Sequence, residues 1–181
     1  MSENAPEPGL LWGIRQSFLR YVSRIPDCQQ YVGDGATLTS EGLYHFALDT
    51  SPPVGREADR FPGPLRYRGH VQFTGYSGML SVVVLNPWIE NNNGETTLTI
   101  ANPMQPNSRI PLAKLVPFNV THARPDVMVV RASTYLMTSA VTVFGGSYAA
   151  GEGLDPVVYT YKPEWNSSRA SAHEASSTNR S

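Results

Sequence analysis

Residues 65–103 carry the strongest β-strand pattern in the chain, and this pattern most constrains the fold. The stretch LRYRGHVQFTGYSGMLSVVVLNP (65–87) first alternates polar and apolar side chains and then becomes almost continuously apolar. Alternation is typical of a strand with one buried face, and an apolar run is typical of a strand buried on both faces. The turn sequence NNNG (91–94) and the strand-forming stretch ETTLTIANP (95–103) follow. We therefore expect a β-hairpin here.

The composition also indicates a mainly β domain. Charged residues make up only 16 % of the 181 residues, whereas glycine and proline contribute 15 each and divide the chain into short segments. The 14 basic and 15 acidic residues nearly cancel, so we expect neither nucleic acid nor an anionic membrane surface as a partner. The single cysteine, Cys28, excludes an internal disulfide.

We predict one mainly β domain at residues 9–161, made of two packed antiparallel sheets in a sandwich-like arrangement with a short N-terminal helix. Residues 1–8 are expected to form a disordered lead. Residues 162–181 are polar and rich in serine, so we expect a disordered tail there. The segment 51–64 is dense in proline and glycine and is expected to be a surface loop.

The N-terminal segment LLWGIRQSFLRYV (10–22) has helical periodicity. We expect a helix from about Leu10 to Ser23 that ends before Pro26, because the residue before a proline avoids the α-helical region. The apolar stripe of this helix is expected to hold Leu10, Ile14, Phe18, Tyr21 and Ile25. Its solvated side is expected to hold Arg15, Arg20 and Arg24.

Ser17 lies on the same stripe, one turn before Tyr21, so two hydroxyl groups interrupt an otherwise apolar surface. In one interpretation Tyr21 is an ordinary core residue and Ser17 bonds to a backbone carbonyl. In the other, the pair faces polar partners or a ligand, because an unpaired buried hydroxyl costs about 1–3 kcal/mol. The helical pattern alone leaves both interpretations open.

The sequence contains no G-x-S-x-G, Walker or H-E-x-x-H motif, no G-x-G-x-x-G that opens a helix, and no histidines spaced as metal ligands. The N-terminal residues MSENAPEPG have neither the basic region nor the apolar run of a signal peptide. No segment approaches the ~18 apolar residues of a membrane-spanning helix. We therefore expect a cytoplasmic protein without a membrane segment.

Three segments carry a resemblance to a known family. GLLWGIRQSFLRYV (9–22) contains an S-F-x-x-Y pattern, RGHVQFTGYSGMLSVVVLNP (68–87) is similar to a G-x-V-x-F-x-G-H-x-G-x-L strand pair, and MTSAVTVFGGSYAAGEGLDPVVYTY (137–161) is similar to a closing segment that ends in L-D-P. Together, in this order, they resemble the HtaA domain, the haem-binding module of actinobacterial haem-uptake proteins. The resemblance covers about residues 9–161.

The resemblance implies a β-sandwich-like body with a short helix that carries the haem site. It implies that the tyrosine of S-F-x-x-Y, here Tyr21, binds the iron, and that Ser17 neighbours the site, where a hydroxyl suits a haem propionate. A tyrosine has a pKa near 10, so a neighbour must favour loss of its proton. In the family this neighbour is the imidazole of the F-x-G-H-x-G turn. Here the position is Tyr76, whose phenol does not accept a proton as imidazole does.

Three further residues are candidates for the site. His70 has the same strand parity as Tyr76, so it replaces the imidazole only if the turn around Gly75 brings it to the site; otherwise it is a surface-facing strand residue. Phe144 and Tyr148, in FGGSYAAG, stand next to glycines that allow close backbone approach. Their rings suit the walls of a pocket for a flat ligand, or ordinary core packing.

Two classes of function follow. In the first, the protein binds haem, or a similar flat apolar ligand, in a pocket between the N-terminal helix and the sheet, with Tyr21 as the iron ligand. The residues expected to line this pocket are Ser17, Tyr21, Tyr76, Phe144 and Tyr148. In the second, the protein is a cofactor-free isomerase, dehydratase or lyase. The phenols of Tyr21 and Tyr76 then polarise a carbonyl group of an apolar substrate, and His70 or a carboxylate acts as the base. A small apolar molecule is the partner in both classes, and the sequence sets neither its identity nor the oligomeric state.

Overall fold

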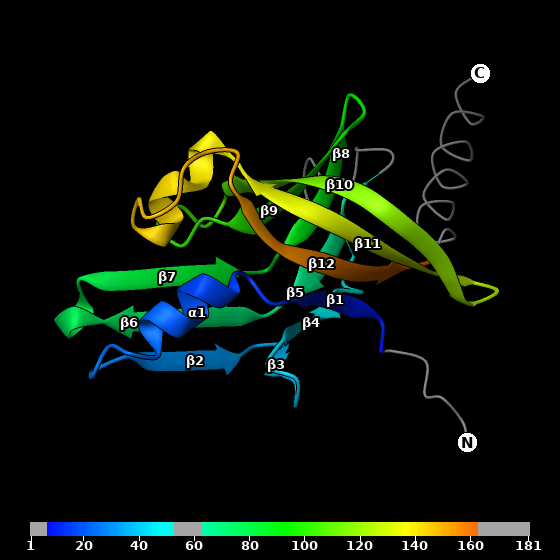
Figure 1. Ribbon diagram of the computed structural model, residues 1–181. Helices are drawn as coiled ribbons and strands as arrows, with labels where there is room; N and C mark the ends of the chain where they lie inside the picture. Colours follow the sequence, from blue (N-terminus) through cyan, green and yellow to red (C-terminus); the bar gives the residue numbers. More distant parts are fainter. Residues whose placement is uncertain (1–6, 53–62, 163–181) are drawn as a thin grey trace.

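The computed structural model describes residues 7–52 and 63–162 (Figure 1). The expected lead, tail and surface loop therefore lie mostly outside the described residues. Within the described part the chain forms twelve strands, one α-helix and two short 3₁₀ helices. In chain order they are β1 (Gly9–Trp12), α1 (Gln16–Val22), β2 (Gln29–Gly33), β3 (Ala36–Leu38), β4 (Tyr44–Leu48), β5 (Leu65–Arg68), β6 (His70–Gly75), η2 (Tyr76–Gly78), β7 (Leu80–Leu85), β8 (Trp88–Asn92), β9 (Glu95–Ala101), β10 (Arg109–Arg124), β11 (Val127–Leu136), η3 (Thr138–Phe144) and β12 (Gly153–Tyr161).

Nine of the described strands form one antiparallel sheet in the order β1-β12-β11-β10-β9-β8-β5-β4-β3. Because β1 also pairs with β4, eight of these strands close into a barrel-like ring, and β3 lies outside the ring against β4. A second sheet has the order β2-β6-β7. The prediction of a mainly β fold is confirmed. The larger sheet closes into a ring because β1 pairs along both of its edges, and a three-stranded sheet is attached to it. The expected sandwich-like arrangement is not confirmed.

The predicted turn at NNNG (91–94) joins β8 to β9. Asn93 and Gly94 have φ angles of 52° and 84°, as the favoured two-residue hairpin turn requires at both central positions. Residues 65–87 do not form one long strand. They divide into β5, β6 and β7, and the chain reverses between the last two at Tyr76–Gly78.

The N-terminal helix begins later than the sequence pattern predicts. Residues Gly9–Trp12 form β1, whose backbone pairs with β4 on one side and β12 on the other, and Ile14 has a left-handed φ of 63°. These long-range backbone hydrogen bonds outweigh the local helical periodicity. The predicted stripe is therefore wrong for Tyr21: Phe18 and Val22 face the core, whereas Tyr21 is 46 % exposed.

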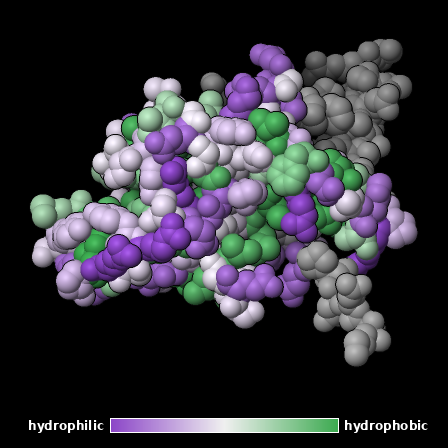
Figure 2. Space-filling view, viewed as in Figure 1, coloured by the Kyte–Doolittle hydropathy of each residue, from purple (hydrophilic) through white to green (hydrophobic). Residues whose placement is uncertain are grey.

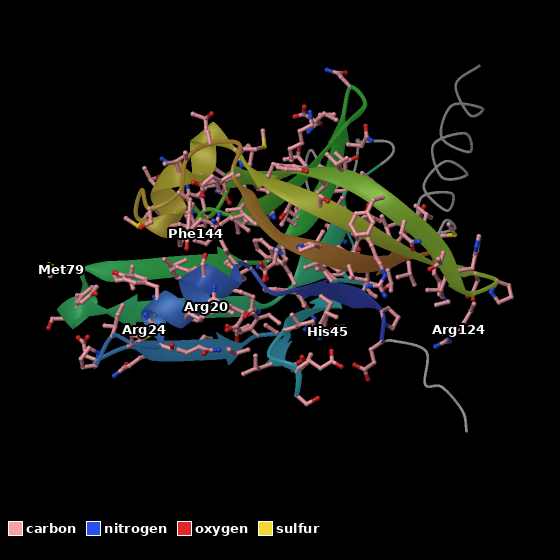
Figure 3. All side chains as sticks on the ribbon, viewed as in Figure 1. Arg20, Arg24, His45, Met79, Arg124 and Phe144 are labelled. Carbon is pink, nitrogen blue, oxygen red and sulfur yellow. The ribbon has the colours of Figure 1, made fainter. Side chains whose placement is uncertain are left out.

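Helix α1 lies across the three-stranded sheet, which projects to the left of the ring in Figure 1. The buried ring of Phe18 packs edge-to-face against Phe73 of β6, with centroids 5.3 Å apart, and against Phe144 of η3 at 5.6 Å. The opposite side of the helix faces solvent. Figure 2 shows a hydrophilic surface there, and Figure 3 shows Arg20 and Arg24 on this side. The aromatic contacts thus fix which residues α1 presents outward.

Candidate functional site

Ser17 and Tyr21 lie one turn apart on α1, beside its core-facing row. Residues four positions apart on a helix share a face, so the anchoring of Phe18 and Val22 in the core sets the direction of this second row. Ser17 is half-buried and Tyr21 is exposed. The two hydroxyl groups are therefore presented at the surface and do not interrupt the core, which resolves the apparent conflict in the helical pattern.

The hydroxyl of Tyr21 donates a hydrogen bond to the hydroxyl oxygen of Tyr76, with the oxygens 3.2 Å apart. Tyr76 lies in η2, the turn between β6 and β7, and is 44 % exposed. The hydrogen bond to Tyr76 raises the pKa of Tyr21 above its ordinary value of 10.0, and a smaller contribution comes from desolvation. The structure therefore brings together the two phenols that the sequence resemblance paired.

The turn that carries Tyr76 is held by Asp27, which follows α1 by five residues. The backbone N–H groups of Tyr76 and Ser77 donate to the two carboxylate oxygens of Asp27, at 2.9 and 2.6 Å. Both donor residues have left-handed φ angles, 50° and 54°, so their N–H groups converge on one anion. These bonds, that of Ser77 first, lower the pKa of Asp27. Asp27 thus holds the backbone of the turn that carries Tyr76 close to the end of α1.

On the other side of α1, Ser17 Oγ lies 3.3 Å from the hydroxyl of Tyr148. Arg15 Nε donates to the same Ser17 oxygen at 2.8 Å, and the Arg15 guanidinium stacks 4.1 Å from the centroid of the Tyr148 ring. A second nitrogen of Arg15 pairs with Glu152 at 2.9 Å. Arg15 is therefore bound to its neighbours, contrary to the expectation that it is simply solvated. It ties the start of α1 to the segment before β12.

Phe144 lies in the core and is only 1 % exposed. The ring of Phe144 packs on Phe18, and its centroid lies 6.0 Å from the centroid of the Tyr148 ring. Figure 3 places Phe144 at η3, above α1. Of the two expected ring walls, Tyr148 is the one that reaches the polar row of the helix, and Phe144 supports it from the core.

The structure does not bring His70 to the two phenols. His70 begins β6 whereas Tyr76 follows its end, and at roughly 3.3 Å per residue the strand separates them by about 20 Å. Its Nδ1 lies 3.6 Å from a carboxylate oxygen of Asp34, and its ring meets the edge of Tyr31 at 4.9 Å. His70 does not stand where the cofactor-free enzyme hypothesis needs it, and the carboxylate nearest Tyr76, that of Asp27, is occupied by two backbone N–H groups. The geometry therefore does not favour that alternative.

Sequence reasoning missed Asp27 and Arg15 as parts of the site. Both act on residues far along the chain, Asp27 on the turn at Tyr76 and Arg15 on Tyr148 and Glu152. The one local signal was the Pro26-Asp27 pair directly after the helix, where Asp side chains often accept backbone hydrogen bonds. Among residues 7–52 and 63–162 no group of three or more histidine, cysteine or acidic side chains gathers as a metal site. No helix in the same part of the chain has the length and apolar character to cross a membrane.

The fold and the sequence together place the chain in the class of HtaA domains, because the HtaA family model, described as Htaa, matches residues 8–160. This chain belongs to the HtaA family.

Several solved structures share the fold. The C-terminal domain of HtaA from Corynebacterium glutamicum is similar at 21 % identity and a TM-score of 0.67, over 85 % of this chain and 94 % of that chain. The N-terminal domain of HtaA from the same organism gives 22 % identity and a TM-score of 0.65, over 85 % and 95 % of the two chains. The heme binding protein HtaB from Corynebacterium glutamicum is similar at 19 % identity and a TM-score of 0.60, over 83 % of this chain and 90 % of that chain. No curated protein matches the chain.

Proposed function

We propose that this protein binds haem at the surface formed by α1, the β6–β7 turn and Tyr148, with Tyr21 as the iron ligand. The observation that carries the proposal is the contact between the half-exposed phenol of Tyr21 and Tyr76, at the position where the HtaA pattern has its tyrosine and its partner. HtaB, which shares the fold, is a heme binding protein.

The residues at this surface fit haem. The Tyr21 oxygen is accessible, and tyrosine is an axial ligand of ferric haem in other proteins. Met79, at the tip of the β6–β7 turn in Figure 3, is 87 % exposed and offers apolar contact beside Tyr76. The hydroxyl groups of Ser17 and Tyr148 form a polar pair suited to a propionate. Haem offers an apolar face for the apolar contact, an iron for the accessible phenol, and propionates at its edge for the hydroxyl pair.

The residues also explain how Tyr21 becomes a ligand. Haem, when bound, supplies a ferric ion that stabilises the phenolate form of Tyr21. Tyr21 must release the proton that it now donates to Tyr76. The Tyr76 hydroxyl then turns to donate to the Tyr21 oxygen, and a hydrogen bond to a phenolate favours the charged form. Asp27 keeps Tyr76 within reach during this reversal.

A titration with hemin tests the proposal. We expect the wild-type protein to give a sharpened Soret band and the spectrum of a high-spin ferric phenolate, and Tyr21→Phe to lose both. Tyr31→Phe is the matched control, because Tyr31 on β2 is 48 % exposed, much like Tyr21. It should bind hemin as the wild type does. A Tyr21→Phe variant with wild-type spectrum and affinity would overturn the assignment of the ligand.

A further inference from the structure

The barrel-like ring contains a cavity that the haem proposal does not use. Its volume is about 370 Å³, at the small end of the range found for ligand pockets. Its walls include Leu65, Ile89, Val120, Val130, Tyr159 and Tyr161. None of these residues belongs to the surface around Tyr21. The cavity is therefore a separate feature of the fold.

Strand register explains where the cavity lies. Val120 of β10 pairs with Val130 of β11, which pairs with Tyr159 of β12, so the three side chains form one row on the same face of the sheet. Tyr159 also pairs with Leu10 of β1, which is fully buried and continues the row. Val120, in contrast, is 53 % exposed. Val120 therefore lies at the rim of the cavity, and its neighbours in the row, Val130 and Tyr159, are buried walls; strands β10, β11 and β12, which carry this row, run to the right in Figure 1.

The chemistry of the walls selects a class of ligand. None of the described residues that line the cavity carries a charge, so a charged molecule would lose hydration without compensation. Tyr159 is only 6 % exposed, and its hydroxyl makes no hydrogen bond with any residue that the structure describes. Burial raises the pKa of Tyr159 to about 12, so the hydroxyl remains a donor at neutral pH. The described lining is mostly apolar, with Asn91 and Thr96 among its polar side chains, and an unpaired phenol there can donate to a ligand acceptor.

We propose that this end of the ring is a second binding site, for a small neutral apolar molecule that carries one carbonyl acceptor for the Tyr159 hydroxyl. The site is separate from the Tyr21 surface, because the described residues that line it do not belong to that surface. Tyr159 sets the orientation of the ligand, and the apolar side chains supply most of the contact area.

The probe for this site is Prodan, a neutral naphthyl ketone whose emission reports both polarity and hydrogen bonding to its carbonyl. We expect saturable one-to-one binding to the wild-type protein with blue-shifted emission. Tyr159→Phe should weaken binding about three- to tenfold, because one hydrogen bond is lost, and shift the emission further to the blue. Tyr135→Phe, on an exposed tyrosine of β11, is the matched control and should bind as the wild type does.

A second pair of variants tests the location. Val120→Trp fills the rim and should abolish Prodan binding while hemin binding is retained. Val116→Trp, on the same strand but outside the cavity walls, should bind the probe normally. Melting temperatures establish that each variant is folded, and if Val120→Trp is not, the Tyr159→Phe pair decides. The proposal is overturned if the wild type shows no saturable binding, if Tyr159→Phe binds as tightly as the wild type, or if Tyr21→Phe abolishes binding of the probe.

Discussion

The contact between Tyr21 and Tyr76 places two phenols where the HtaA pattern has a tyrosine and a histidine. An imidazole with a pKa near 6.5 can keep the proton that the ligand tyrosine loses, whereas a second phenol cannot at neutral pH. Under the proposed function, the proton of Tyr21 must leave for solvent when the phenolate forms. The affinity of this protein for haem should therefore depend more strongly on pH than the affinity of a protein with a tyrosine–histidine pair.

We predict that the affinity for hemin rises about tenfold per pH unit between pH 6 and 8. The pKa of Tyr21 is raised in the free protein, so Tyr21 is protonated throughout this window and each binding event releases one proton. Absorbance titrations at several pH values measure this slope. In Tyr76→His the imidazole should retain the proton, so the slope should flatten above about pH 6.5 and the Soret band should sharpen. Equal slopes in the two proteins would contradict the role given to Tyr76.

At the scale of elements, the β6–β7 turn is positioned by one carboxylate, that of Asp27. We predict that Asp27→Asn lowers hemin affinity about three- to tenfold, because an amide oxygen replaces only one of the two acceptors that hold the turn. Asp34→Asn, an exposed aspartate beside His70, is the control and should leave the affinity unchanged. Retention of wild-type affinity by Asp27→Asn would show that the turn holds Tyr76 without this carboxylate.

The same substitution has a signature in stability. The pKa of Asp27 is lowered in the folded protein, so its contribution to stability is present above the unfolded pKa of about 4 and is lost as pH falls through the folded pKa. The melting temperature of the wild type should therefore exceed that of Asp27→Asn at neutral pH, and the gap should close on acidification. A gap that stays constant down to pH 3 would indicate that the carboxylate charge is not its source.

The elements also show what a sequence pattern reveals and what it does not. The i, i+4 spacing of Ser17 and Tyr21 is local, and the resemblance placed Tyr76 beside them, so this grouping was predictable. The start of α1 was not, because β1 at Gly9–Trp12 exists through pairing with strands about 35 and 145 residues away. The hydrogen bonds from the turn to Asp27 were not predictable either, because they join residues about 50 positions apart.

For the whole molecule, the strand alternation in the sequence does not distinguish a sandwich from a closed ring. A period of two residues says that one face of a strand is buried, and it says nothing about which strand edges meet. The ring closes because β1 pairs with both β4 and β12. One buried side chain reinforces this closure: Thr160 Oγ1 accepts from the backbone N–H of Gly9 at 2.7 Å and donates to its carbonyl oxygen at 3.2 Å.

We predict that Thr160→Val lowers the free energy of unfolding by about 1–3 kcal/mol, because it keeps the shape of the side chain and leaves the Gly9 N–H group without that partner. Urea denaturation measures the change. Thr37→Val, on exposed β3 outside the ring, is the control and should change it by less than about 0.5 kcal/mol. Both variants should keep the hemin spectrum of the wild type. Equal stability of the two variants would show that the Thr160 contacts do not stabilise the closed ring.

Resonance Raman spectroscopy of the ferric hemin complex, excited in the phenolate-to-iron charge-transfer band, observes the proposed bond itself. In wild-type protein that contains ring-deuterated tyrosine, we expect enhanced phenolate ring modes that shift with the isotope. Tyr31→Phe should retain these modes and Tyr21→Phe should lose them. Their absence from the wild-type complex, or their persistence in Tyr21→Phe, would contradict the assignment of Tyr21 as the ligand of haem iron.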